Sequence, residues 1–453
     1  MSVSSIILIV AAGVALLLLL VLKVRINAFI SLLITAIFVG ILAGMPLREV
    51  TAAIQKGMGE TLGFIAVVVG LGAIFGQILE SSGGAHALAN SLLRKFGQGR
   101  ASWAMLFTGF IVAIPVFFDV GLIILIPLIY ALGRDTGKSL LYYGIPLLAG
   151  LAVAHSFIPP TPGPVAVSEI IGADLGWVIL LGLMLGLPTA VIAGPLFGRF
   201  IAGRIKIDPP DAVTGESDDE TSRNGLPSFR LIFILIITPL MLIVISTISA
   251  ILIRNGGLAS SMVTDILIFA GHPFSALIIA TLLAIWLLGI RRGMSRDRIM
   301  ILSTKALGPA GIIILVTGAG GVLKEVLVQS GIGTTLADSV AGTALSPIVL
   351  AWVVAALVRI TQGSATVAMI TAAGIVAPML SVFALDAPHM ALIVIAISSG
   401  ATIASHVNDS GFWLVSKYFG MNEKQTLQSW TVMETIISVC GLLFTLTASL
   451  IIR

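Results

Sequence analysis

The sequence predicts an all-α polytopic membrane protein, and three observations point to that fold class. Hydrophobic residues make up 58% of the 453 residues and charged residues only 10%, a composition too apolar for the surface of a soluble domain. Apolar runs of about 20 residues, the length of a bilayer-spanning helix, recur along the chain. The runs are continuous rather than alternating, which excludes a β-barrel.

The first half of the chain combines uninterrupted apolar runs with two interrupted ones. Lys23 and Arg25 follow the first run, the reverse of a signal peptide, so we expect a retained first helix. Residues 204–230 are acidic and rich in Pro, Ser and Gly, which indicates a solvated linker. Before it, we expect spans at about 5–22, 27–45 and 60–80, an amphipathic segment at 85–96, interrupted runs at 103–131 and 144–171, and a span at 177–199.

The second half repeats this order of elements. The segment from Gly70 to Gly83 also aligns with the segment from Gly318 to Gly331. We therefore predict a first repeat at 1–203, the linker at 204–230 and a second repeat at 231–453. The second repeat is expected to contain spans at 231–253, 274–290 and 306–328, an amphipathic segment at 333–343, interrupted runs at 347–383 and 389–418, and a last span at 430–452.

The distribution of Lys and Arg predicts how the repeats are oriented. Basic residues collect in loops that we assign to the cytoplasm, with both termini and few basic residues on the periplasmic side. This assignment requires 103–131 and 347–383 to be re-entrant hairpins that return to the side they enter from. Each half then crosses the membrane five times, in addition to its re-entrant hairpin, and because five is odd the halves are inverted. Inverted repeats with paired broken elements are typical of secondary transporters.

The strongest signal of a broken helix runs from His155 to Pro164. Pro159, Pro160 and two further prolines in this stretch remove backbone donors and clash with the preceding helical turn. Non-helical backbone at membrane depth is tolerated only where it is buried in protein or lines a cavity. The alternative is a structural kink with a satisfied histidine.

Charged residues at membrane depth are the first functional candidates. An ionised Asp or Arg at a helix centre costs about 2.5–3.5 kcal/mol on insertion scales, so such residues are rare without a partner. Asp119, Arg359 and Asp409 lie in predicted hairpin tips or helix breaks. A buried structural ion pair of Arg359 with Asp119 or Asp409 is the alternative to a transport role.

The polar groups at these interruptions favour a small, hydroxyl-rich organic anion. Helix N-termini at tips and breaks suit a carboxylate, and hydroxyl and amide side chains suit a polyhydroxylated chain. Carboxyl and imidazole groups there are candidates for a coupling proton, namely Asp119, His155, His406 and Asp409. The candidate substrate-binding residues are Ser156, Thr161, Gly163, Arg359, Thr361, Gln362, Gly363, Ser364, Thr366, Asn408 and Ser410.

Other classes of function fit less well. The single cysteine, Cys440, rules out a cysteine metal cluster, and no nucleophile–base pair or nucleotide motif is visible. We therefore expect no enzyme activity, cofactor, metal or nucleic-acid partner, only the solute, a proton and the lipid bilayer. An anion channel remains the rival from another class, and it would need a continuous wet pore.

Several motifs resemble those of the gluconate permease, or gluconate:proton symporter, family: Lys56-Gly-Met-Gly-Glu-Thr-Leu-Gly63, Phe117-Phe-Asp-Val-Gly121, His155-Ser-Phe-Ile-Pro-Pro-Thr-Pro-Gly-Pro164, Thr361-Gln-Gly-Ser-Ala-Thr366 and Ser405-His-Val-Asn-Asp-Ser410. The resemblance covers essentially the whole chain. It implies proton-coupled symport of gluconate or a related sugar acid across the bacterial inner membrane. It also implies an elevator-type carrier of the ion-transporter superfamily, with a scaffold, a moving transport domain and, by analogy alone, a homodimer.

Two residues depart from the family pattern, which commonly has Glu in place of Asp119 and His in place of Thr161. The substrate therefore stays open among gluconate, other aldonates and D-serine, which one branch of the family carries. The coupling ion, H⁺ or Na⁺, is also open.

Overall fold

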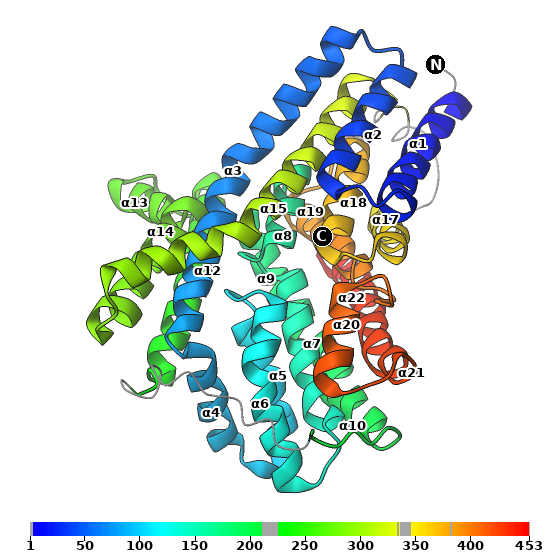
Figure 1. Ribbon diagram of the computed structural model, residues 1–453. Helices are drawn as coiled ribbons and strands as arrows, with labels where there is room; N and C mark the ends of the chain where they lie inside the picture. The colour runs from blue at the N-terminus through cyan, green and yellow to red at the C-terminus, as the bar shows by residue number, and fades with distance from the viewer. Residues whose placement is uncertain (1–2, 211–224, 333–334, 336–345, 381–382, 453) are drawn as a thin grey trace.

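The structure is a computed structural model, of which residues 3–210, 225–332, 335, 346–380 and 383–452 are described (Figure 1). Every regular element in these ranges is a helix. Seven of the described helices are long and apolar enough to cross a membrane, judged by length and composition. The predicted all-α polytopic fold is confirmed at this level.

The first half begins with three helices that are continuous except for a π-helical turn after α1. A short amphipathic helix, α4, follows them, and four shorter segments then form two interrupted pairs before the last helix of this half. The elements are α1 (Val3–Leu18), α2 (Ala28–Leu42), α3 (Leu47–Ser81), α4 (Gly84–Phe96), α5 (Ala101–Val112), α6 (Phe118–Thr136), α7 (Leu141–Phe157), α8 (Pro162–Ile171), α9 (Leu175–Val191), the π-helical turn η3 (Ile192–Leu196) and α10 (Phe197–Ala202).

The second half follows a comparable order. Its elements are α12 (Phe229–Arg254), α13 (Met262–Gly271), α14 (Pro273–Ala284), α15 (Arg296–Gln329), α17 (Pro347–Gln362), α18 (Ala365–Leu380), α19 (Ala387–Gly400), α20 (Ser410–Phe419), α21 (Glu423–Thr426), the π-helical turn η7 (Leu427–Thr431) and α22 (Val432–Ile451).

Three helices differ from the expected spans. The helices α3 and α15 extend well beyond 60–80 and 306–328 because their polar flanks consist largely of good helix formers. The helix α13 was not predicted. A Ser261 capping box begins it, and it ends just before Pro273. The predicted amphipathic segment 333–343, apart from Thr335, and most of the acidic linker lie outside the described residues.

The long helices α3 and α15 both run obliquely through the molecule and cross each other in close contact (Figure 1). A Cβ atom on Gly57 would lie 2.7 Å from the carbonyl oxygen of Gly321, and one on Gly321 would lie 2.0 Å from Oγ1 of Thr61. Beside the crossing, Lys56 Nζ lies 2.8 Å from Glu325 Oε1. Glycine at the contact lets the two backbones touch, and the partly exposed ion pair adds a polar contact beside it.

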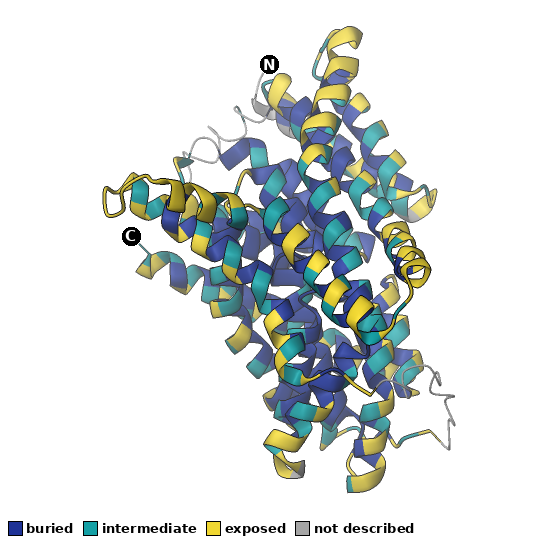
Figure 2. Cartoon of the chain, turned by 90° about the vertical axis from the view of Figure 1, so that its left-hand side faces the viewer, coloured by how far each residue is buried: buried dark blue, intermediate teal, exposed yellow. Residues whose placement is uncertain are grey.

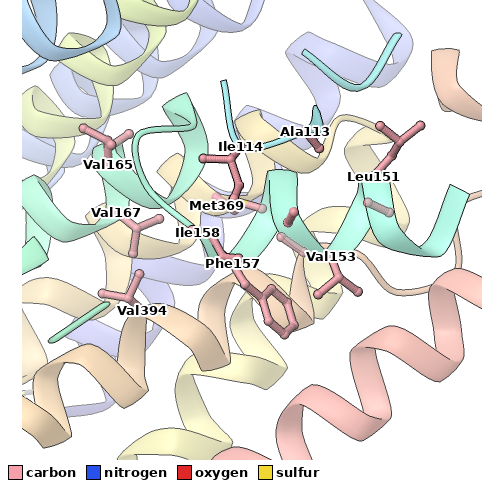
Figure 3. Packing of buried hydrophobic residues seen from close by; sticks show 14 of the residues in the cluster. Ala113, Ile114, Leu151, Val153, Phe157, Ile158, Val165, Val167, Met369 and Val394 are labelled. Atoms are coloured by element: carbon pink, nitrogen blue, oxygen red, sulfur yellow. The ribbon is translucent and has the colours of Figure 1, made fainter. Parts of the chain in front are cut away.

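The interrupted helix α7–α8 lies at the centre of the molecule and is almost entirely buried. Figure 2 shows this dark-blue centre surrounded by partly exposed outer helices. Around the interruption, Phe157 and Ile158 pack among residues of the α5–α6 connection, α18 and α19, including Ile114, Met369 and Val394 (Figure 3). The first broken helix is therefore held inside protein on all sides, as broken backbone at membrane depth requires.

Candidate functional site at four helix interruptions

Four helix interruptions bring non-helical backbone into the interior. Each leaves a helix C-terminus and a helix N-terminus whose free C=O and N–H groups need partners. Across these points, α8 packs against α18 and α6 contacts α20. The interruptions lie between Val112 and Phe118, Phe157 and Pro162, Gln362 and Ala365, and Gly400 and Ser410.

A buried ion pair joins the α17–α18 connection to the α19–α20 connection. Arg359 Nη2 donates to Asp409 Oδ2 at 2.6 Å, and the two residues are only 3% and 8% exposed. Arg359 Nη1 also donates to the carbonyl of Gly363. The Ser405 hydroxyl and, at 3.0 Å, the Gly411 N–H donate to Asp409. Arg359 lies in the last turn of α17 and Asp409 caps α20, so each charge is also favoured by its helix dipole.

This pairing decides between the two partners that the sequence left open for Arg359. Asp119 lies in the first turn of α6 and is exposed. No ion pair joins it to Arg359 in the described part of the chain, and the charge that acts on it is that of Asp409. Of the two ion pairs that the sequence left open, the one with Asp409 is therefore the pair that forms among the described residues.

Asn408 and Gly363 lock the same two connections together. Asn408 Nδ2 donates to the carbonyls of Ile360, at 3.0 Å, and Thr361, at 3.3 Å, which closes the C-terminus of α17. Gly363 has a φ of 79°, and a Cβ there would lie 2.2 Å from the Asn408 carbonyl oxygen. Only glycine fits both the left-handed backbone and this contact. Asn408 therefore uses its amide donor within the protein.

The remaining polar candidates in and near the α17–α18 connection differ in whether their side chains already have hydrogen-bond partners within the protein. The Thr361 hydroxyl donates back to its own helix, and Ser364 Oγ accepts the N–H of Val367 at 3.4 Å. Gln362 is buried, and neither atom of its amide has a hydrogen-bond partner. Thr366 is half-buried in α18. Ser410, exposed, begins α20 on the other side of the ion pair.

The first broken helix forms a small pocket with the α5–α6 connection and α3. Its lining includes Pro115, His155 and Thr161, and it has room for about one water molecule. His155 Nδ1 is buried without a partner, whereas the Thr161 hydroxyl donates to the Ile158 carbonyl at 2.5 Å. Ser156 is buried but does not line this pocket.

Further along the broken helix, Gly163 lets α8 approach α18. A Cβ on Gly163 would meet the sulfur of Met369 at 2.6 Å. The start of α8 is therefore held directly against α18.

Aromatic rings connect the pocket with the ion pair. The ring of Phe117 lies 6.2 Å from that of His155, and Phe118 lies 5.4 Å from Trp430. Trp430 Nε1 donates to Ser405 Oγ at 2.7 Å, and Ser405 in turn bonds to Asp409. A chain of contacts thus links candidates from both halves of the protein. His406, another proton candidate, is half-buried and bonds to the carbonyl of Ala404 at 2.8 Å.

One buried carboxyl group was missed by the sequence reasoning. Glu434 is 4% exposed and lies close enough to Arg359 and Asp409 for their charges to act on it. The signal that could have identified it is simple: Glu434 is the only charged residue in α22.

Comparison with known proteins places the chain among bacterial permeases. The family model for GntP family permease matches residues 5–451. The chain is 42% identical to the low-affinity gluconate transporter of Escherichia coli strain K12 over 441 residues, covering 97% of each chain. It is 41% identical to a gluconate permease of Pseudomonas aeruginosa, covering 96% of each. It is also 40% identical to an L-idonate transporter of E. coli, covering 96% of this chain and 97% of that one.

Two solved structures share the fold at low sequence identity. The YdaH transporter of Alcanivorax borkumensis is 14% identical, with a TM-score of 0.59 over 88% of each chain. MtrF of Neisseria gonorrhoeae, described as representing a class of antimetabolite efflux pumps, is 16% identical, with a TM-score of 0.61 over 88% of this chain and 83% of that one. The full-length family match, together with relatives at 40–42% identity, shows that this chain belongs to the GntP family of permeases.

Proposed function

We propose that the protein is a proton-coupled symporter that carries gluconate or a related aldonate across the bacterial inner membrane. The observation that carries this proposal is the identity of about 40% to permeases named for gluconate and idonate, over nearly the whole chain. As a member of a permease family, the protein moves solutes and is not an enzyme.

The arrangement at the interruptions supports an anionic, hydroxylated substrate. The cation Arg359 is buried, its Nε has no partner, and both amide atoms of Gln362 are unsatisfied. A carboxylate and neighbouring hydroxyl groups would satisfy these atoms, since buried polar atoms rarely stay unpaired. In the first broken helix, His155 Nδ1 is a further unpaired group. We assign these residues to binding, with the other polar residues of the interruptions shaping the site.

The pocket at His155 is too small for a sugar acid in this arrangement. It lies where the α5–α6 connection and the start of α8 meet α3. Binding therefore requires these segments to separate from α3. Such a movement is what an elevator-type carrier would supply.

We propose that a carboxyl or imidazole group at the interruptions carries the coupling proton. Asp119 is the first candidate because it is exposed at the start of α6, where it can exchange protons with water. Asp409, His155 and His406 are the others, and Asp409 is already engaged by Arg359.

We further propose two inverted repeats, 1–203 and 231–453, in a homodimer with both termini periplasmic. The scaffold consists of the helices within 5–80 and 231–328. The transport domain consists of the hairpins 103–131 and 347–383, the broken helices 144–171 and 389–418, and the helices that follow them.

Uptake by proteoliposomes tests the proposed function. Purified protein should concentrate labelled gluconate above its external level when an inward proton gradient is imposed, and a protonophore should abolish this accumulation. Competition by unlabelled gluconate, idonate and D-serine would rank the substrates, because Asp119 and Thr161 leave the choice open. Equilibration without accumulation under every ion gradient would instead indicate a channel.

A further inference from the structure

Glu434 lies on the face of α22 that is turned toward the ion pair. Trp430, Glu434 and Ser438 are spaced four residues apart and share one helix face. Trp430 bonds to Ser405 in the α19–α20 connection at 2.7 Å, and Trp352 Nε1 of α17 donates to Ser438 Oγ at 3.1 Å. Glu434 is one turn from each of these contacts, so its side chain lies between α17 and the α19–α20 connection.

The buried charges at this point do not balance if every group is ionised. One guanidinium, that of Arg359, is buried beside two carboxyl groups, those of Asp409 and Glu434. Asp409 is the one that receives the Arg359 guanidinium, the Ser405 hydroxyl and the Gly411 N–H, all of which favour its ionised form. Glu434 has no ion-pair or hydrogen-bond partner among the described residues. A buried carboxyl group without compensation takes up a proton.

We propose that Glu434 is a second, buried proton-holding residue of this carrier, in addition to the exposed Asp119, and that it is protonated while Arg359 is paired with Asp409. The inference rests on the proposed symport function, which it deepens. A proton from water forms the O–H bond of the Glu434 carboxyl group on one side of the membrane, and the same bond breaks on the other side. While Glu434 is neutral, Arg359 and Asp409 cancel, and an anion approaches without net repulsion. Once Glu434 ionises, the cluster carries a net negative charge and repels the anion, so proton and anion bind together.

Few other titratable groups surround Glu434. The elements packed against α22 include α7, α9, α17, α19 and the π-helical turns η3 and η7, and α9, η3 and η7 contribute none. The charges that act on Glu434 are those of Arg359 and Asp409. The remaining titratable groups on these elements, on the α19–α20 connection and on α22 itself are Tyr142, Tyr143, His155, His389, His406 and Cys440.

Infrared spectroscopy of the purified protein in lipid tests the protonation without any substrate. The wild-type protein should show a protonated carboxyl C=O absorption at neutral pH, and Glu434→Gln should lose it. Glu423→Gln, which changes an exposed glutamate just before α22, is the matched control and should keep the absorption. An absorption that persists unchanged in Glu434→Gln overturns the proposal. If that variant does not fold, Glu434→Asp should shift the absorption, and an unshifted band has the same meaning.

Transport measurements test the coupling. In proteoliposomes, Glu434→Gln should lose accumulation driven by a proton gradient but keep exchange of labelled for unlabelled gluconate. Gluconate binding to the wild-type protein should weaken about tenfold per pH unit once Glu434 ionises, whereas binding to Glu434→Gln should not change. The coupling role is overturned if Glu434→Gln still accumulates gluconate under a proton gradient, or if its gluconate binding depends on pH as that of the wild-type protein does. If the wild-type protein carries no aldonate, the proposed function fails, but the infrared measurement still shows whether the Glu434 carboxyl group is protonated.

Discussion

Asp119→Asn and Asp409→Asn form a matched pair of substitutions, because the same change falls on an exposed and on a buried carboxylate. At position 409, the single amide oxygen of Asn can still accept the N–H of Gly411, as Oδ1 of Asp409 does. Its NH₂ group then replaces Oδ2, so Asp409→Asn removes both the charge that lies 2.6 Å from Arg359 and the acceptor of the Ser405 hydroxyl. At position 119, no ion pair of the described structure is lost.

The expected magnitudes differ by several kcal/mol. Removing one partner of a buried ion pair costs about 3–5 kcal/mol, because the other charge stays buried without compensation. A substitution at an exposed site such as Asp119 usually changes stability by at most about 0.5 kcal/mol. In Asp409→Asn, Glu434 can ionise and partly compensate the buried charge of Arg359. The double variant Asp409→Asn/Glu434→Gln lacks this compensation and should therefore be destabilised more than Asp409→Asn alone.

Thermal unfolding in detergent, followed by tryptophan fluorescence, measures the difference. Asp119→Asn should unfold at the wild-type temperature, and Asp409→Asn well below it. In proteoliposomes, Asp119→Asn should lose accumulation driven by a proton gradient but retain part of the exchange activity. Equal destabilisation by the two variants would refute the assignment of Asp409 as the partner of Arg359. Undiminished accumulation by Asp119→Asn would remove Asp119 from the coupling.

Two further predictions concern the scaffold and the topology. Gly321→Ala should lower the unfolding temperature, since its Cβ would lie 2.0 Å from Oγ1 of Thr61 and overpacking costs about 1–3 kcal/mol. Gly59→Ala, on the same crossing helix pair but with nothing within 4 Å, is the control and should be neutral or stabilising. In a Cys440→Ser background, Ser364→Cys should react with membrane-impermeant thiol reagents from the periplasmic side only. Labelling from the cytoplasm alone would contradict the inverted repeats.

The sequence predicts the helix interruptions well because their signals are local. Pro159 and Pro160 lie within the actual break between α7 and α8, and Gly363 lies at the connection of α17 to α18. Prolines and polar residues in an apolar run conflict with a lipid-facing helix whatever surrounds them. The positions of these interruptions therefore follow from the chain alone.

The partners of the charged residues do not follow from local signals. Arg359 and Asp409 are 50 residues apart, and only the packing of α17 against α19 brings them together. The same holds for Lys56 and Glu325, which are 269 residues apart. Glu434 was missed because an acidic residue near the start of a span is equally compatible with an exposed helix end. Its burial depends on α17 and the α19–α20 connection, which lie earlier in the chain.

The pattern of tight contacts supports the proposed division into a scaffold and a transport domain. The ion pair and the Asn408 bonds tie the α17–α18 and α19–α20 connections into one unit, while Lys56 and the glycine contact tie α3 to α15. Between these units, α15 meets α18 through Gly320 and Gly374, where a Cβ on Gly374 would lie 2.9 Å from the Gly320 carbonyl oxygen. The side chain of Ile370 also packs against Gly320, where a Cβ would lie 2.4 Å from its Cγ2, so sliding of α18 along α15 has to displace this side chain. If α18 moves along α15, the charge cluster moves with it as a body, and Glu434 can reach water on alternate sides without Arg359 and Asp409 separating.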